Sequence, residues 1–322
     1  MREHVGLIEA LGLRPWAATA RQARLAIVGD PTVPASRFGL STLRQVRLRM
    51  GVTLWLGGKP RGRRVPITNL YNYRQPPPEL GWSVRVTDVE DFRGGQNTYD
   101  SHNGTDFAIP PGTAVVAAAP GRVVRVSSEY HRGGRKIFLD HGRGLVTTYN
   151  HLARPLVEPG ADVRRGQTIA LSGYSGLDAL VGFPWSPPHV HFNTWLNGAY
   201  VDPFAPVARG EASLWRRAND PVPAAPADLA DDDFEPTPWA PAALAVLIAA
   251  CVDDATRREI EAQPTLAQRA GAALMHACYF PTRFGPGGAE ARGALHGATY
   301  PREPRLDLPF SHEDYDGVVF DR

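Results

Sequence analysis

The chain of 322 residues is 43% hydrophobic and 21% charged, which is ordinary for a globular protein, and its length suggests two or three domains or one domain with long additions. Its formal net charge of +2 is too small to make nucleic acid or an anionic membrane the main partner. The longest apolar run, 242–251, is far shorter than the roughly 20 residues that cross a bilayer, so no transmembrane segment is expected.

The two cysteines, Cys251 and Cys278, belong to no CxxC pattern, which argues against a cysteine-based zinc site or redox pair. One disulfide and two buried free thiols are both compatible with the sequence. The N-terminus has no basic start followed by an unbroken apolar stretch, so no secretory signal peptide is predicted and the cellular location stays open.

Residues 1–95 are expected to form a mixed region of short helices and a hairpin. Apolar residues recur at helical spacing near 7–11, 23–27 and 41–50. The β-prone stretches 52–56 and 65–67 flank a Gly-Gly-Lys-Pro-Arg-Gly turn, which predicts that they pair as a hairpin.

Residues 96–209 have the pattern of a β-rich domain, with short apolar runs separated by Gly and Pro. Such closely spaced strands indicate an antiparallel sheet or sandwich, and Asn197-Gly198 is a strong two-residue turn signal. The predicted strands are 114–118, 121–126, 136–140, 145–151, 168–172, 190–196 and 199–201.

The C-terminal third begins with a stretch rich in Pro, Ala and Asp, 210–240, which is typical of a linker. Residues 241–322 follow as a helical region with a tail, and helices are predicted at 241–262 and 265–279. The fold class expected for the whole chain is therefore α+β, a β-rich core flanked by helical regions.

Six of the ten histidines fall between positions 102 and 191, inside the β-rich segment. His102 and Asp106 lie four positions apart around Gly104, and imidazole nitrogen and carboxylate oxygen are both zinc ligands. By itself this spacing also fits a turn that Asp106 caps. His189 and His191 alternate along a predicted strand, so both rings project from the same face.

Tyr149 and His151 share a strand face by the same alternation. Taken together, these pieces supply two imidazoles and one carboxylate for a three-ligand zinc site with a position open to water, which is the catalytic pattern. Zinc in such a site activates water. Two further histidines could accept the proton of that water and donate to the oxyanion or the leaving amine.

Five sequence blocks closely resemble the lysostaphin/LytM-type zinc endopeptidases in order and spacing, over about a third of the chain. They are HNGTDFAIPPGTAVVAAAPGRVVRV, LDHGRGLVTTYNHL, VRRGQTIALSGYSG, PHVHF and NGAYVDP. The resemblance implies a compact antiparallel β domain with a groove over one zinc ion per chain. It implies His102, Asp106 and His191 as the zinc ligands, and His151 and His189 as the catalytic pair.

The activity that this resemblance implies is cleavage of peptide bonds in peptidoglycan stems or cross-bridges. Peptidoglycan peptide would then be the partner, and the protein would act in the cell envelope or outside the cell. The chain reads HVHFN where the family usually reads HLHFE, so Asn193 stands at a common glutamate position. The loop before this motif is enlarged at 178–186 and is expected to line the groove. We expect Tyr149, Asn193 and Trp185 to contact substrate.

Other histidines are assigned no chemistry. His141 is expected to serve a turn between strands, and His131 to be solvated in a Gly-rich loop. His312-Glu313 begins like the HExxH zinc motif, but Asp316 stands where the second histidine belongs, so that site is rejected.

Two other functions are compatible with the sequence. One is a non-catalytic wall-binding or regulatory module on the same fold, although all five site positions are filled here. The other is a zinc peptidase that acts on a non-wall peptide. Because relatives can be blocked by N-terminal chain over the metal, and 69–72 is an Asn-bearing stretch, trimming residues 1–80 is predicted to raise activity. The oligomeric state stays open.

Overall fold

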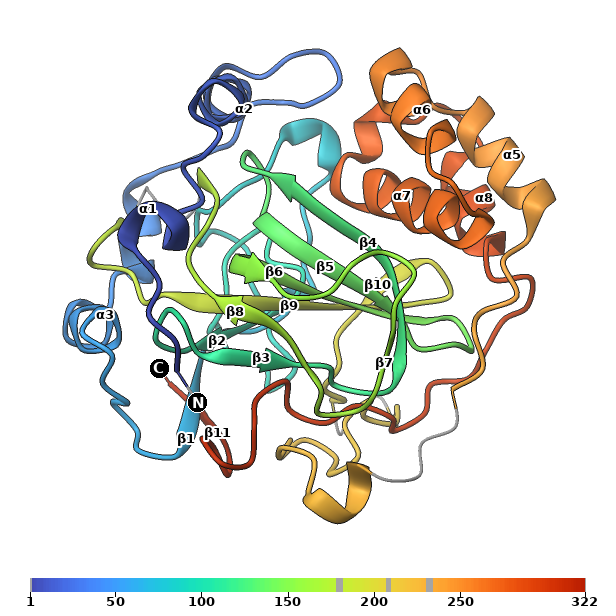
Figure 1. The fold of residues 1–322 in the computed structure, drawn as a ribbon. Coiled ribbons are helices and arrows are strands. Elements are labelled where there is room, and N and C mark those ends of the chain that lie inside the picture. Colours follow the sequence, from blue (N-terminus) through green and yellow to red (C-terminus); the bar gives the residue numbers. More distant parts are fainter. Residues whose placement is uncertain (1, 178–181, 207–209, 230–233, 322) are drawn as a thin grey trace.

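The computed structural model describes residues 2–177, 182–206, 210–229 and 234–321, and its elements are drawn in Figure 1. The α-helices are α1 (Leu7–Ala10), α2 (Trp16–Val28), α3 (Leu48–Trp55), α5 (Pro241–Ala249), α6 (Asp254–Glu261), α7 (Leu266–Tyr279) and α8 (Gly288–Ala294). Short 3₁₀ turns are Leu40–Gln45, Pro78–Leu80, Pro226–Leu229 and Pro281–Arg283.

The strands form one sheet in which β11, β1, β2, β9, β6, β5, β4 and β7 lie side by side in that order. Strand β10 adds to β9, and β8 joins β3 to β6. All pairs are antiparallel except β1 with β11. The strands are β1 (Arg64–Asn69), β2 (Thr105–Ala108), β3 (Ala114–Val116), β4 (Gly121–Glu129), β5 (Gly134–Asp140), β6 (Leu145–Pro155), β7 (Asp162–Val163), β8 (Thr168–Ser172), β9 (His189–Leu196), β10 (Ala199–Val201) and β11 (Gly317–Phe320).

The predicted α+β class is confirmed, and a strand is present at each position expected between 114 and 201. The hairpin expected between 52–56 and 65–67 is wrong. Residues 52–55 belong to α3, because their apolar side chains have helical spacing and bury Leu54. Strand β1 pairs instead with β2 and with the distant β11, contacts that local sequence does not encode.

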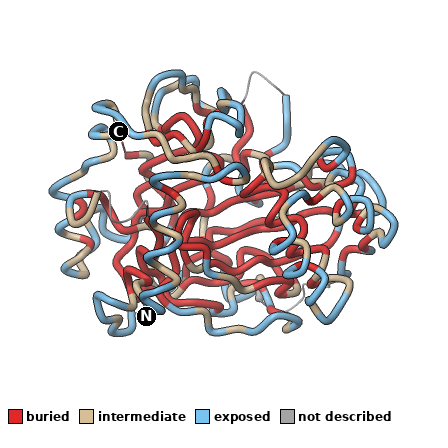
Figure 2. The backbone as a smooth tube through the Cα atoms, turned by 90° about the horizontal axis from the view of Figure 1, so that it is seen from above, coloured by how far each residue is buried: buried red, intermediate tan, exposed pale blue. Residues whose placement is uncertain are grey.

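The main hydrophobic core lies on one face of the sheet, and Figure 2 shows the buried strands running through the middle of the molecule. The stretch predicted as a linker contributes Leu214 and Trp215 to this core, and the tail contributes Leu306 and Phe310. These segments are therefore packed parts of the fold where the structure describes them. The expected domain boundary at residue 209 lies outside the described residues.

A second apolar cluster joins the sheet to helices α5–α8, which stand together beside β4 and β5 in Figure 1. Phe138 and Trp195 from the sheet pack in this cluster with Leu247 and Leu274 from the helices. Thr265 begins α7 with a reciprocal capping box to Gln268, which satisfies two of the free amides at its start. None of the described helices combines the length and the apolar character that crossing a bilayer requires. Both cysteines are free and buried.

Buried charges cross the same interface between sheet and helices. The Lys136 ammonium is fully buried and lies 2.9 Å from the Glu129 carboxylate. Arg125 lies 3.6 Å from Glu129 and also pairs with Glu259 of α6. Burial by itself would raise the pKa of Glu129, but Lys136 and Arg125 lower it to about 2.

We expect Glu129→Gln to lower the free energy of unfolding by about 3 kcal/mol at pH 7, since it removes the carboxylate that balances the buried charge of Lys136. A carboxyl group with a folded pKa of about 2 and an ordinary value of 4.5 stabilises the fold fully above pH 4.5. That contribution is lost as the pH falls from 4.5 towards 2, so the difference between variant and wild type should shrink at pH 3.

Urea unfolding of the metal-free protein at pH 7 and pH 3 measures both values. Glu261→Gln, at an exposed position at the end of α6, is the control and should change stability by less than about 0.5 kcal/mol. An equal loss at both pH values would contradict the assigned ion pair.

Candidate metal centre

A row of polar side chains crosses four neighbouring strands. Asn69 of β1 is paired with Asp106 of β2, Asp106 with His191 of β9, and His191 with Asn150 of β6. Residues directly opposite each other in a sheet present their side chains on the same face. The sheet register thus brings together a histidine and an aspartate that are far apart in sequence.

His102 comes from the loop just before β2, and its Nδ1 lies 2.6 Å from the backbone oxygen of Leu70. Gly104 lets this loop approach β9 closely. A Cβ on Gly104 would lie 2.5 Å from the backbone oxygen of Phe192 and 2.8 Å from Nε2 of His191. The close approach of these two chain segments therefore requires glycine at position 104.

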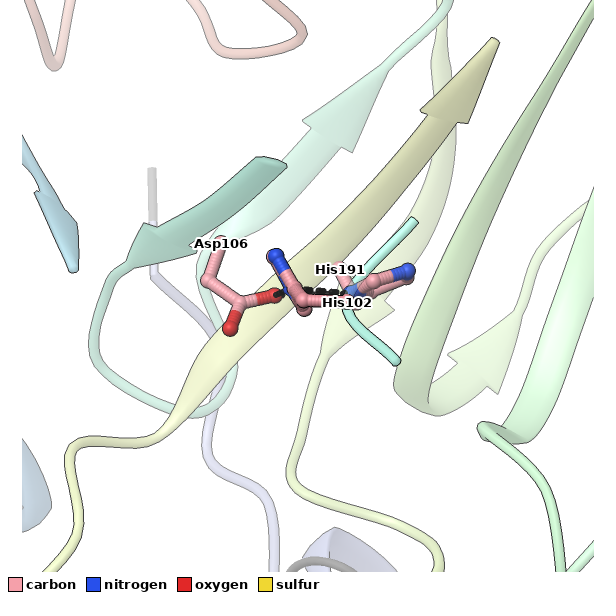
Figure 3. A group of neighbouring side chains, drawn as sticks. All are labelled: His102, Asp106 and His191. Carbon is pink, nitrogen blue, oxygen red and sulfur yellow. Dashed lines mark hydrogen bonds and ion pairs between the residues drawn. The ribbon is translucent and has the colours of Figure 1, made fainter. Parts of the chain in front are cut away.

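Figure 3 shows the side chains of His102, Asp106 and His191 converging on one point. Nε2 of His102 lies 2.9 Å from Oδ1 of Asp106 and 3.1 Å from Nδ1 of His191. Nδ1 of His191 lies 2.7 Å from the same Asp106 oxygen. Ligand atoms around a tetrahedral zinc ion stand about 3.4 Å apart, so this buried triangle of two nitrogens and one oxygen is close to the size that zinc needs.

The protonation states of these groups suit a cation. Nδ1 of His102 donates to Leu70, so the lone pair of Nε2 faces the other two ligands. Burial lowers the pKa of His191 although Asp106 opposes the shift, which favours the neutral ring that binds metal. Burial would raise the pKa of Asp106, but His102 and His189 lower it well below its usual range, so the carboxylate is charged.

The two predicted catalytic histidines lie beside this triangle. The rings of His151 and His189 are 4.8 Å apart, and Nε2 of His189 is 3.6 Å from the Asp106 carboxylate. Nδ1 of His151 lies 2.7 Å from the backbone oxygen of Ser175, and Nδ1 of His189 lies 3.0 Å from that of Pro187. With Nδ1 donating to a carbonyl, Nε2 is the atom of each ring that can take or give a proton.

Tyr149 does not line the site, contrary to the sequence prediction. It is fully buried in the core against Phe192, and its hydroxyl accepts a hydrogen bond from the backbone nitrogen of Ala118. His151 has a φ of 61°, so strand alternation ends there and its ring leaves the face of Tyr149. Alternation alone could not reveal this local change of direction.

The other two predicted substrate contacts, Asn193 and Trp185, lie in different surroundings, one buried and one exposed. Asn193 is fully buried behind His191, with its Nδ2 2.8 Å from Nε2 of that ring, so it cannot contact substrate directly. Trp185 is 49% exposed in the loop before β9, and its backbone oxygen accepts a hydrogen bond from Arg47.

The structure separates the two remaining histidines of the segment from the triangle of His102, Asp106 and His191. His141 is buried and bonds to the backbone oxygen of Pro120 and to Thr147, as a residue that fixes a turn would. His131 was expected to be solvated, and that is wrong. It is 7% exposed and stacks on Phe280, because the C-terminal helical region covers its loop.

A cavity of about 290 Å³ opens beside the site, and its lining includes Asp106 and His189. Phe38 and Val46 from the N-terminal region and Tyr174 from the loop after β8 give it apolar walls. The N-terminal region therefore forms part of the groove. Asn69, which the sequence placed in a candidate blocking stretch, donates to Oδ2 of Asp106 at 2.8 Å.

The enlarged loop at 178–186 is only partly visible, since 178–181 lie outside the described residues. Gly182 and Ser186 of this loop line the cavity, together with Pro187 that follows it.

The prediction that trimming residues 1–80 raises activity stays untested. Such a cut would remove β1, with the buried Val65 and Ile67, and the Leu70 carbonyl that holds His102.

Comparison with known proteins places this geometry in a family. Residues 100–203 match the family described as Peptidase family M23. The chain carries an M23 peptidase domain. A Haemophilus influenzae protein named as an uncharacterized metalloprotease is 38% identical over 112 residues, which are 35% of this chain and 22% of that protein. Peptidoglycan DD-endopeptidase ShyA of Vibrio cholerae is 39% identical over 101 residues, 31% of this chain and 22% of ShyA.

The chain thus matches 22% of the length of each of these two curated relatives. Among solved structures, a zinc-containing peptidase from Vibrio cholerae is 29% identical, with 44% of this chain and 38% of that chain covered and a TM-score of 0.32. The catalytic domain of lysostaphin from Staphylococcus simulans is 32% identical, with 32% and 77% covered and a TM-score of 0.28.

Proposed function

We propose that this protein is a zinc metallo-endopeptidase that hydrolyses peptide bonds in peptidoglycan stem peptides or cross-bridges. The observation that carries the proposal is the buried triangle of His102, Asp106 and His191 inside the M23 domain, with two more histidines beside it. The name of the Vibrio cholerae relative, a peptidoglycan DD-endopeptidase, supports the substrate class.

Three protein ligands leave a coordination position for water or substrate, which distinguishes a catalytic zinc site from a structural one. A zinc ion held there would supply Lewis-acid activation of water and polarisation of the scissile carbonyl. We assign His151 as the general base, which takes the proton of the attacking water on Nε2 and returns it to the leaving amine. We assign His189, with a proton on Nε2, as the group that stabilises the developing oxyanion.

The cavity next to His189 is the proposed place of the substrate chain. Its walls are largely apolar, with Phe38, Val46, Val84 and Tyr174 among them. Such walls fit small apolar side chains and exclude water from the carbonyl that is attacked, which strengthens electrostatic stabilisation.

Mass spectrometry of muropeptides after digestion of purified cell wall tests the function directly. We expect new free amine termini at one kind of peptide bond, and none when a chelator is present. Binding to the wall without new termini would favour the non-catalytic module instead. Cleavage of other peptides with the wall left intact would favour a non-wall substrate.

A further inference from the structure

A tyrosine outside the M23 match reaches the metal centre from the C-terminal helices. Tyr279 ends α7, and its hydroxyl lies 2.7 Å from Oδ1 of Asn193 and 2.9 Å from Oδ1 of Asn150. Burial raises the pKa of Tyr279, so its hydroxyl keeps its proton and acts as a donor.

Asn193 is held in one orientation by its neighbours. Its Oδ1 accepts from Thr148 at 3.0 Å and from Nδ2 of Asn150 at 2.9 Å, in addition to Tyr279. Three donors on one oxygen oblige the other end of the amide, Nδ2, to face Asn103, next to the ring of His191. The side chains of Thr148, Asn150 and Asn193 are fully buried, so water cannot replace these bonds.

The same amide fixes the acceptor that His191 needs. When Nδ1 of His191 faces a metal ion, Nε2 carries the ring proton and requires an acceptor. The Oδ1 atom of Asn103 lies 3.3 Å from Nε2. Asn193 donates to that oxygen and to the backbone oxygen of Asn103, both at 2.9 Å, and so keeps Asn103 in place. Asn103 thus supplies the acceptor for the ring of His191, and Asn193 holds Asn103 in place.

We propose that Tyr279 is a positioning residue for the metal ligand His191 and acts through Asn193. The inference rests on the zinc site of the proposed function, but not on the substrate. It makes the C-terminal helices a working part of the metal centre, because the hydroxyl that completes the network comes from α7. Loss of this hydroxyl removes the shortest of the three bonds to Oδ1 of Asn193 and so loosens the amide that holds Asn103, the acceptor for the ring of His191.

Zinc affinity of the purified full chain, measured by competition with a chromophoric chelator, tests the proposal. Second-shell changes typically weaken metal binding by about 10- to 100-fold. Tyr279→Phe removes one oxygen two contacts from the ligand, so we expect its zinc dissociation constant to rise roughly three- to tenfold. Tyr200→Phe is the matched control, because its ring lies 6.2 Å from that of Tyr279 and its buried hydroxyl has no hydrogen-bond partner among the described residues. It should change affinity less than about twofold.

A double-mutant cycle tests whether Tyr279 acts on His191 through Asn193. Because Tyr279 is proposed to act through Asn193, adding Tyr279→Phe to Asn193→Ala should weaken zinc binding no further than Asn193→Ala alone. If circular dichroism shows that Asn193→Ala is unfolded, the visible absorption bands of the cobalt-substituted protein decide instead. Those bands should shift in Tyr279→Phe and stay unchanged in Tyr200→Phe.

Independent, additive losses in the cycle would overturn the proposal, as would a zinc affinity and cobalt spectrum of Tyr279→Phe equal to those of the control. A protein that holds zinc with this dependence on Tyr279 but hydrolyses no peptide would refute the proposed function and leave the inference standing. Hydrolysis together with a zinc affinity that does not change in Tyr279→Phe would refute the inference and leave the proposed function standing.

Discussion

His102→Ala and Asp106→Ala should each reduce hydrolysis of the cell-wall peptide by about 10³-fold or more and leave little bound zinc. Lewis-acid activation contributes several kcal/mol to the transition state, and each 1.36 kcal/mol is a factor of ten in rate. Each substitution removes one corner of a triangle whose atoms lie 2.7 to 3.1 Å apart. The two residues that remain are too few for a stable zinc site.

Release of amine termini and zinc content by atomic absorption measure this result on the same samples. His312→Ala is the control, since His312 is exposed and belongs to the sequence that merely begins like an HExxH motif. It should keep full activity and full zinc. Activity of His102→Ala near that of wild type would refute the metal site. Loss of activity and zinc in His312→Ala would indicate that the C-terminal tail around His312 binds the metal instead.

His151→Asn and His189→Asn should each lower kcat by about 10² to 10⁴ while zinc content stays unchanged, because they remove proton transfer but no ligand. Asparagine suits position 151 because it tolerates the positive φ of 61° found there. If the two rings act in one step, the double variant should lose much less than the product of the two single losses.

Steady-state kinetics on a defined stem peptide, with zinc content determined in parallel, measure these losses. A fall in zinc content in either variant would make that histidine a ligand instead of a proton-transfer group. Retention of wild-type kcat in His151→Asn would transfer the role of general base to His189.

The convergence of the three candidate metal ligands is the part of the site that the sequence predicted most fully. His102, Asp106 and His191 converge as the HxxxD and HxH patterns indicate, because a short loop and strand alternation dictate where neighbouring side chains point. The same rule failed for Tyr149, whose neighbour His151 leaves the regular strand conformation. A positive φ in a non-glycine residue has no signal in composition or spacing.

The hydrogen-bond network behind His191 was indicated more weakly by the sequence. Asn103 lies inside the HxxxD block and Asn193 follows the HxH motif, so both were within reach of the sequence, yet their roles depend on cross-strand contacts. Nothing in the sequence indicated a role for Tyr279. A helical apolar pattern does not show that its hydroxyl will bond to Asn193. The failed hairpin at 52–67 has the same origin, since β1 finds its partners in β2 and β11.

Local sequence by itself determined the seven predicted strands between 114 and 201 and the helix at 265–279, because periodicity is a property of short segments. The helix predicted at 241–262 is instead two helices, α5 and α6. Only the tertiary structure decided that the N-terminal region lines the groove, that Trp215 and Phe310 complete the core, and that the hydroxyl of Tyr279 in α7 bonds to Asn193. Burial and long-range hydrogen bonds fix those features. Such contacts join segments that are far apart in the chain, and the sequence of one segment does not show which other segment it will pack against.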